Sequence, residues 1–451
     1  TYIEQGGAIQ ADGGRVYLTA KAAGDLAAGV INHTGVTQAR TVAENDRGEI
    51  WLMGDMQHGE TRVAGTLDAS APASLNPSGG DGGFIETSAA KVSIMDEATV
   101  TTRADDGQTG EWLIDPQDYT VASSGADMTG NALSNNLAEN NVTIASVQGG
   151  EDGNGDIFVN DEVTWSSGNT LTLNAQRNIE INEEIDASQG GGGKLALEYG
   201  QGSTNGEIDG ETALYTVNAP VNLQAGQSFS TQLGGDGNNR IDFTVITRLT
   251  GGSDTNLSDL QGNSHLSGNF ALGADIDASD TENWDSGKGW KPIGDSISPS
   301  KSFSGVFDGL GHTLSGLTIN RGTEEFGVGL FGTTNGTASN IAQGIAQFSN
   351  LGLTDVNISG DRRVGSLLGW MTLISGRNAP IIRNVYTTGT VIGQERVGGL
   401  VGNGFGVRGA ILDSHTHVDV TGKETVGGLI GGTNSNYTSL KLKNNYTTGK
   451  V

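Results

Sequence analysis

The sequence predicts an all-β fold, an elongated parallel β-solenoid made of short stacked strands. A hexapeptide of the form V-G-[GS]-L-[LVI]-G occurs at residues 364–369, 397–402 and 426–431, with starts 33 and 29 residues apart (397 − 364 and 426 − 397), and a degenerate copy lies at 328–332. A period of roughly 20–50 residues marks units that bury their apolar faces only against neighbouring units. The chain also has 73 Gly but only 7 Pro among 451 residues, and Gly accepts the positive φ of tight corners.

Composition excludes several classes of function. The formal net charge is −27, and Lys and Arg are not clustered, so a nucleic-acid binder and a protein drawn to an anionic membrane are not expected. The absence of Cys excludes disulfides and thiolate metal sites. No apolar run approaches the ~18 residues of a membrane span. The chain has neither a signal peptide nor an initiating Met, and we expect it to be part of a longer protein.

A looser strand repeat runs through the first half. Gly followed by alternating apolar residues begins at Gly14, Gly48, Gly110, Gly155 and Gly193, with a weaker copy at Gly83. Alternation with period two is typical of strands with one face inside and one outside. We therefore assign solenoid stretches to residues 1–114 and 146–230.

Residues 115–145 are predicted to form a helix-containing insertion between these stretches. Asp115-Pro116 stops strand pairing, because Pro cannot donate to a ladder. A helix is expected over residues 127–139, with Leu133 and Leu137 on one face and Asp127 as N-cap.

The remaining chain divides into a loop-rich module at 231–301 and a repeat solenoid at 302–451. Within the second hexapeptide, Val397 and Val401 are predicted to point inward, and Gly399 to lie where a neighbouring coil approaches closely. Gly399→Val should then overpack the stack at a cost of roughly 1–3 kcal/mol. Leu400 has the opposite parity, so either the strand kinks at the Gly pair or Leu400 packs against an outer loop.

Several motifs resemble those of known surface proteins. Residues 13–24 (GGRVYLTAKAAG) resemble the end of the secretion domain of filamentous-haemagglutinin-like exoproteins, the two-partner-secreted adhesins of Gram-negative bacteria. Residues 112–116 (WLIDP) with 141–144 look like a segment common in the same proteins. Residues 305–312 (GVFDGLGH), 317–319 and the hexapeptides look like GLUG-type repeats. Biofilm matrix adhesins of pseudomonads are among the similar proteins.

The resemblance implies a right-handed parallel β-helix, with 1–114 following a secretion domain and 302–451 forming the GLUG-type part. It implies a secreted or cell-surface, outer-membrane-associated protein, exported through an outer-membrane partner that would recognise a region before Thr1. It also implies adhesion to extracellular polysaccharide or to glycans of other cells. By this resemblance, we expect most of the secretion domain to lie before Thr1.

Two groups of residues are weak metal candidates. Asp152, Asn154 and Asp156 have the D-x-N-x-D start of a calcium loop, but an EF-hand needs Gly and Glu where Ile157 and Val163 stand. A structural turn is the favoured interpretation, and no cofactor is expected apart from this possible calcium. The second group is His415 and His417, which would share a strand face as a zinc pair, although exposed strand residues are favoured.

The loop around 275–292 is the candidate for ligand binding. Trp284 and Trp290 could form a stacking platform for a sugar, because an aromatic face packs well on the apolar face of a pyranose. Asp280 and Asp285 would be the polar partners. The favoured alternative is that both Trp side chains cover the flank of the solenoid.

The sequence thus predicts a non-enzymatic adhesin shaft or binding segment for cell-surface or biofilm adhesion. The alternative is a β-helical polysaccharide lyase or glycoside hydrolase, which would need two carboxylates facing each other across a groove. A scaffold for self-association is a third possibility.

Overall fold

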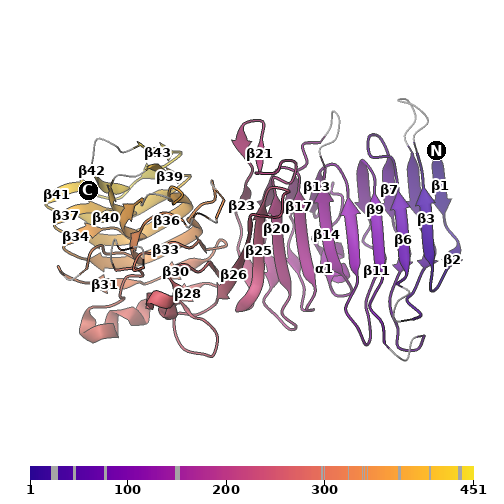
Figure 1. The fold of residues 1–451 in the computed structure, drawn as a ribbon, viewed down its shortest axis with the longest axis horizontal. Coiled ribbons are helices and arrows are strands. Elements are labelled where there is room, and N and C mark those ends of the chain that lie inside the picture. Colours follow the sequence, from indigo (N-terminus) through magenta and orange to yellow (C-terminus); the bar gives the residue numbers. More distant parts are fainter. Residues whose placement is uncertain are drawn as a thin grey trace. The chain divides into compact units, whose positions relative to one another are not determined.

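The computed structural model describes residues 1–21, 29–43, 47–75, 79–147, 153–295, 298, 300–323, 325–337, 339, 341–342, 344–373, 377–405, 408–434 and 439–451. The chain divides into two compact units, Thr1–Leu223 with Ser228–Arg240, and Gln224–Gln227 with Ile241–Val451. Strands predominate in both (Figure 1), so the all-β prediction is confirmed. The predicted insertion at 115–145 falls inside the first unit, and most of the 231–301 segment falls inside the second.

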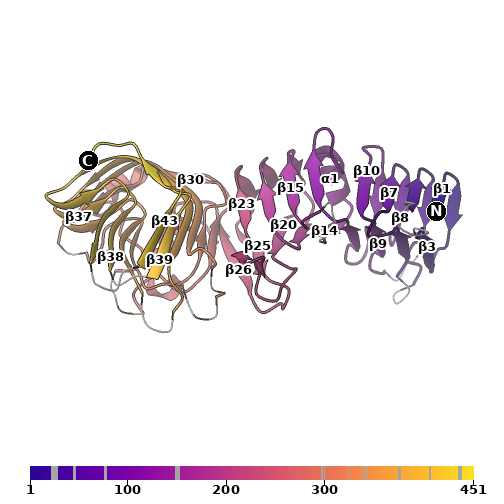
Figure 2. The same ribbon diagram turned by 90° about the horizontal axis from the view of Figure 1, so that it is seen from above.

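In the first unit, the strands form rows of parallel neighbours, seen from two sides in Figures 1 and 2, and the first coils contribute to three of these rows. Each strand pairs with one about a coil further along; Tyr2, for example, pairs with Val30. The first row holds β1 (Tyr2–Gln5), β4 (Val30–His33), β7 (Glu60–Val63) and β10 (Lys91–Ile94). The second holds β2 (Ala8–Gln10), β5 (Val36–Gln38), β8 (Thr66–Asp68) and β11 (Thr99–Thr101).

The third row is the longest of this unit. It runs through β3 (Arg15–Thr19), β6 (Glu49–Met53), β9 (Phe84–Ser88), β12 (Glu111–Asp115), β14 (Asn141–Ser146), β17 (Thr170–Ala175), β20 (Lys194–Tyr199) and β25 (Gly226–Leu233). Residues that pair across it, such as Val16, Ile50, Ile85 and Trp112, are buried. The inward positions of the Gly-led repeat therefore form a continuous core.

Later coils continue the other faces with new strands. One row holds β13 (Tyr119–Ala122), β15 (Ile157–Asn160), β18 (Ile179–Ile181) and β23 (Tyr215–Val217). Another holds β16 (Val163–Thr164), β19 (Ile185–Ala187) and β24 (Val221–Leu223). The hairpin β21 (Glu207–Ile208) and β22 (Glu211–Thr212) is antiparallel.

The predicted helix exists as α1 (Gly130–Leu137), with Leu133 and Leu137 buried as expected. The prediction of its N-cap was wrong. Thr129 is the N-cap and accepts from the Ala132 N–H at 3.1 Å. Asp127 instead accepts a hydrogen bond from the Thr120 N–H at 2.9 Å, which fixes it to the preceding strand.

Helix α1 takes the place of a strand in the stack. The Val100 N–H of β11 donates to Asn136 Oδ1 at 3.0 Å, and Asn140 Nδ2 donates to the Val100 carbonyl at 2.8 Å. On the other side, the Thr164 N–H of β16 donates to Ser134 Oγ at 2.9 Å. Because buried backbone groups need partners, these side chains substitute for the missing ladder and keep the coil closed across the helix.

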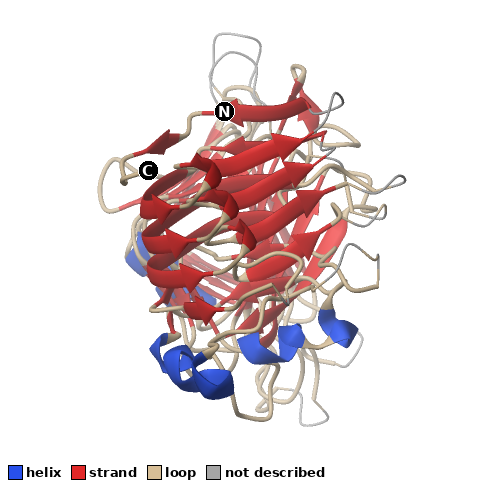
Figure 3. Cartoon of the chain, turned by 90° about the vertical axis from the view of Figure 1, so that its left-hand side faces the viewer, coloured by secondary structure: helices blue, strands red, loops and turns tan. Residues whose placement is uncertain are grey.

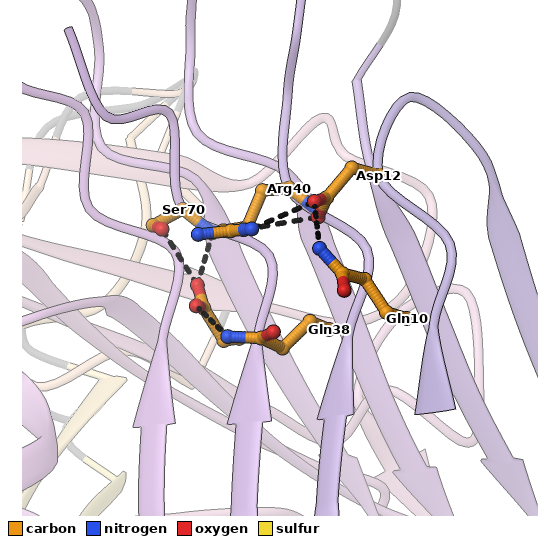
Figure 4. A network of polar contacts seen from close by, with 6 residues as sticks. Gln10, Asp12, Gln38, Arg40 and Ser70 are labelled. Atoms are coloured by element: carbon orange, nitrogen blue, oxygen red, sulfur yellow. Dashed lines mark hydrogen bonds and ion pairs between the residues drawn. The ribbon is translucent and has the colours of Figure 1, made fainter. Parts of the chain in front are cut away.

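A polar ladder lines the end of the second row (Figure 4). Arg40 Nε and Nη2 donate to the two carboxylate oxygens of Asp12 at 3.0 and 2.7 Å. Gln38, in the same coil as Arg40, donates to Asp68 of the next coil, which also accepts from Ser70. The hydrogen bonds from Arg40 hold the pKa of Asp12 well below its usual range. The ladder therefore ties successive coils together at their corner.

In the second unit, where parallel strands lie one above another (Figure 3), the long strands β33 (Phe348–Ser359) and β36 (Ile381–Ile392) each pair with several others. One connected set of parallel pairings comprises β26 (Arg240–Ile246), β27 (Phe270–Leu272), β28 (Ile276–Asp277), β29 (Phe307–Asp308), β30 (Thr313–Ser315), β31 (Thr318–Asn320), β33 (Phe348–Ser359), β36 (Ile381–Ile392), β39 (Arg408–Leu412), β40 (His415–Thr421), β43 (Ser439–Lys443) and β44 (Tyr446–Thr447). Three short 3-10 helices, η1 (Leu257–Gln261), η2 (Asn263–His265) and η3 (Ser279–Gly287), precede most of this stack. Among the described residues, no helix has the length and apolarity needed to cross a membrane.

Each hexapeptide forms a corner between two parallel sheets. The sheet β34 (Arg362–Val364), β37 (Glu395–Gly398) and β41 (Glu424–Gly427) ends in it. The sheet β32 (Phe331–Thr334), β35 (Leu368–Thr372), β38 (Val401–Phe405) and β42 (Ile430–Asn434) begins at its fifth residue or, for β32, at Phe331 of the degenerate copy. The repeat period is therefore the length of one coil.

The inward assignment of the second hexapeptide is confirmed. Val397 and Val401 are fully buried, and so is Leu400. Strand β37 stops at Gly398 and β38 starts at Val401, so the chain kinks at the intervening pair and the parity is reset. Of the two alternatives left open by the sequence, the kink is the one adopted.

Candidate functional site

The segment 275–292 lies at the start of the second unit's stack and includes η3. Its backbone is irregular: Trp284 is extended, whereas Asp285 and Ser286 have φ of 48° and 58°. Non-Gly residues rarely adopt this left-handed region unless their surroundings fix it. Two hydrogen bonds close the turn, from the Gly289 N–H to the Trp284 carbonyl at 3.0 Å and from the Lys288 N–H to the Asp285 carbonyl at 3.2 Å.

Trp290 belongs to the core of this unit. Its side chain is fully buried, and its indole N–H donates to the Leu330 carbonyl at 3.2 Å. Its backbone N–H donates to the Thr318 carbonyl of β31 at 2.8 Å. Trp290 thus has no exposed face for a sugar. Its position agrees with the alternative favoured from the sequence, in which the side chain packs on the solenoid.

Trp284 is the aromatic side chain that reaches the surface here. It is half-buried against the edge of the core, and its ring centroid lies 5.9 Å from that of Trp290 at an interplanar angle of 31°. Asp280 and Asp285 are exposed nearby in the chain. The arrangement presents one aromatic edge with carboxylates, backed by a second aromatic ring.

Arg321 fixes this segment from beneath. Its buried guanidinium donates to the Trp290 carbonyl through Nε at 2.8 Å and to the Gly289 carbonyl through Nη2 at 3.0 Å. Nη2 also lies 3.1 Å from Asp285 Oδ2, and Nη1 lies 3.5 Å from Glu325 Oε1. A rigid, charge-satisfied guanidinium of this kind holds the surface residues in one geometry. No sequence feature identified this role, because Arg321 lies outside the predicted loop.

The acidic residues around the segment do not converge. Asp275 accepts hydrogen bonds from the Thr313 N–H at 2.8 Å and from His312 Nδ1 at 3.3 Å. Burial opposes ionisation of Asp275, but these contacts outweigh it and lower its pKa. Asp277 accepts from the Ser279 N–H at 2.9 Å. Among the described residues, no three His, Asp or Glu side chains lie close enough together to hold a metal ion.

The calcium-loop candidate is partly described: Asp152 lies outside the described residues. The N–H groups of Asn154, Gly155 and Asp156 all donate to one oxygen of Asp118, at 3.0, 2.7 and 2.8 Å. The Asp156 carboxylate pairs with Arg177, whose Nε lies at 2.8 Å. The backbone N–H groups in the described part of the loop therefore surround the Asp118 carboxylate, as in the anion-binding arrangement called a nest.

The histidine pair lies on the outer face of β40, with Thr416 buried between its members. His415 is stacked between Tyr386 and Tyr446, with centroids 5.5 and 4.6 Å away. His417 Nδ1 lies 2.6 Å from Thr448 Oγ1. These contacts fit the favoured interpretation of the pair as strand residues.

Sequence reasoning missed one titratable group. Asp115 ends β12, and among the described residues its buried Oδ1 has no hydrogen-bond partner. Burial, reinforced by the charge of Glu86, raises its pKa to about 6. The sequence feature that could have identified Asp115 is its position directly before Pro116, at the end of a strand with alternating apolar residues.

This pKa makes the stability of the first unit pH-dependent at Asp115. The folded chain holds the proton up to about pH 6, whereas the unfolded chain releases it near 4. Asp115 therefore lowers the free energy of unfolding progressively as the pH rises between these values, and the penalty is complete above them. A two-unit shift corresponds to nearly 3 kcal/mol, which partial exposure reduces to about 1 kcal/mol.

We expect Asp115→Asn to raise the unfolding midpoint at pH 7.5 and to leave it nearly unchanged at pH 4. Urea titrations of both chains at the two pH values measure this difference. An equal effect at both pH values would show that folding does not raise the pKa of Asp115.

Comparisons with known proteins give one match. The chain is 37% identical over 177 residues to halomucin of Haloquadratum walsbyi, a stretch that covers 36% of this chain and 2% of halomucin. The chain thus spans a very small fraction of the relative it matches. No protein-family profile matches the sequence, and no solved structure matches it.

Proposed function

We propose that this chain is a segment of an exported adhesin, built on a right-handed parallel β-helix, that contacts extracellular polysaccharide or the glycans of other cells. The observation that carries the proposal is the in-register parallel pairing of successive coils in both units. Such stacking gives long lateral faces on which side chains repeat at the strand spacing. The likeness to part of halomucin supports a secreted or cell-surface location.

Other properties implied by the sequence resemblance belong to the same proposal. They are membership of the filamentous-haemagglutinin-like family with GLUG-type repeats, export through an outer-membrane partner and a role in biofilms. The motifs at 13–24, 112–116 and 305–312 support them. No catalytic turnover and no obligatory cofactor are expected of this segment.

The segment 275–292 is the proposed contact. Trp284 offers a partly exposed aromatic edge, and Asp280 and Asp285 offer acceptors for sugar hydroxyl groups. Because buried Arg321 fixes the turn, little conformational entropy is lost on binding.

A glycan-array measurement with the whole chain tests this contact. Trp284→Ala should weaken binding about tenfold, since one stacking contact contributes roughly 1 kcal/mol or somewhat more. Asp280→Asn, which keeps size and removes charge, should weaken it less. Undiminished binding by a folded Trp284→Ala chain would place the contact elsewhere, and a parent chain that binds no glycan would contradict the proposal.

One observation favours the alternative, a glycoside hydrolase. A general acid needs a carboxyl group with a raised pKa beside one that stays ionised, and burial, with a smaller effect from the charge of Glu86, raises the pKa of Asp115 to about 6. Release of reducing ends from a polysaccharide, abolished by Asp115→Asn, would establish this activity. Absence of release by the parent chain would leave adhesion as the function.

A further inference from the structure

Three aromatic side chains stand in contact on the solvent side of the first unit's third row. Tyr17 of β3 pairs directly with Trp51 of β6, and their rings stack with centroids 5.9 Å apart at 17°. Phe84 of β9 continues the series, with its centroid 4.9 Å from that of Trp51. We call Tyr17, Trp51 and Phe84 the aromatic strip.

The aromatic strip lies on the outward face of these strands, opposite the core. On each of these strands the intervening residues are the buried ones, among them Val16, Ile50 and Ile85. Tyr17 is nevertheless 54% exposed, and Met53, two residues beyond Trp51 on the same face, is 36% exposed. Large apolar side chains gathered on a solvated face mark a binding surface more often than a structural need.

Carboxylates frame the strip. Glu49 accepts from the Trp51 indole N–H at 3.1 Å and pairs with Arg15 at 2.9 Å. Glu86 pairs with Trp51 across the ladder, and Glu111 pairs with Phe84. Arg15 is thus the single cation that accompanies these three acidic side chains on the paired positions of β3, β6, β9 and β12.

We propose that the aromatic strip binds a polysaccharide that carries no acidic groups. Aromatic faces stack on the apolar faces of pyranose rings. Strands repeat every ~4.8 Å, so rings on successive strands can meet successive sugar residues of one chain. The carboxylates accept hydrogen bonds from hydroxyl or ammonium groups, whereas they repel an acidic polymer, as does the net charge of −27.

The inference rests on the proposed function, because it names the class of glycan and adds a contact surface in the first unit. Cross-strand aromatic pairs also stabilise sheets on their own. A purely structural strip would affect unfolding but not binding, and the experiment measures both.

The whole chain is titrated with a chitosan hexamer, a cellulose hexamer and an alginate hexamer, and binding is followed by calorimetry. We expect the first two to bind and alginate not to bind. Tyr17→Ala should weaken binding about 3- to 10-fold with an almost unchanged unfolding midpoint, since Tyr17 is mostly exposed. Trp51→Phe, which keeps an aromatic face, should weaken it less than Trp51→Ala.

Tyr446→Ala is the matched control. Tyr446 is 57% exposed and also ends an outward aromatic stack, on His415 in the second unit, so its loss should leave binding unchanged. Binding that survives Tyr17→Ala and Trp51→Ala but is lost in Trp284→Ala would overturn the strip and leave the proposed function intact. Preferential binding of alginate would overturn the charge argument, and a parent chain that binds none of the three would overturn the strip, whereas the glycan array decides the proposed function separately.

Discussion

Gly399→Val is expected to destabilise the second unit by about 3 kcal/mol, the upper end of the range for overpacking. A Cβ at Gly399 would lie 2.0 Å from the Gly428 carbonyl oxygen of the next coil and 3.0 Å from Thr416 Oγ1. That carbonyl already accepts a hydrogen bond from Thr416 Oγ1 at 2.7 Å. Because the clash is with backbone, no change of rotamer relieves it, and the coils must separate at this corner.

Gly404→Ala is the control for this substitution. Gly404 lies in β38 of the same coil, but its added Cβ would meet only ends of side chains, the terminal methyl of Ile430 at 3.3 Å and methyl groups of Thr433 and Met371 at 3.8 and 3.9 Å. Chemical denaturation of the three chains, followed by circular dichroism, should show a large shift for Gly399→Val and a small one for Gly404→Ala. Equal shifts would mean that close approach of the coils at the hexapeptide is not what excludes a side chain there.

Trp290→Ala should cost 3–5 kcal/mol of the free energy of unfolding, the usual range for truncating a fully buried Trp. The substitution leaves a cavity in the core of the second unit and removes the indole N–H that donates to the Leu330 carbonyl. The backbone carbonyl of residue 290 still accepts from Arg321 Nε, and the Leu330 carbonyl still accepts from the Ile293 N–H at 3.0 Å. The expected cost therefore comes mainly from the lost burial and the cavity.

Trp284→Ala provides the contrast, since Trp284 is half-buried and should contribute about 1 kcal/mol to stability. Thermal unfolding of the two variants separates packing from surface contact. If Trp290→Ala were as stable as Trp284→Ala, the burial of Trp290 would add nothing to the free energy of unfolding. The assignment of Trp290 to the core and of Trp284 to the surface contact would then be wrong.

The parts of the fold that repeat could be predicted from the sequence. The period of the hexapeptides identified the coil length, and the alternation after Gly14 and Gly48 identified buried Val16 and Ile50. Gly360, Gly393 and Gly422 follow the same period and were missed. A Cβ at each would meet the Val side chains of adjacent hexapeptides within 3.0 Å.

Features that occur once were harder to predict. Asp127 has the residue type of an N-cap, but it lies two residues before the N-cap Thr129, and its carboxylate accepts a hydrogen bond from the Thr120 N–H. For Trp290 the sequence favoured burial against the flank of the solenoid but left a sugar platform open, because its neighbours in sequence are Gly, Lys and Pro; contacts from β31 and from Leu330 bury it. The aromatic strip was invisible as a unit, since Tyr17, Trp51 and Phe84 become neighbours only through the pairing of strands in different coils.

The hexapeptide corners have a consequence for how such a protein can change during evolution. Each of them joins the same two sheets, and Val364, Val397 and Val426 follow one another in register. Recombination between the similar coding segments would add or delete one whole coil, which lengthens or shortens the stack by a single strand spacing of ~4.8 Å. The contacts between coils on both sides of the change would remain native, so gene duplication can change the length of the stack without any other substitution in the chain.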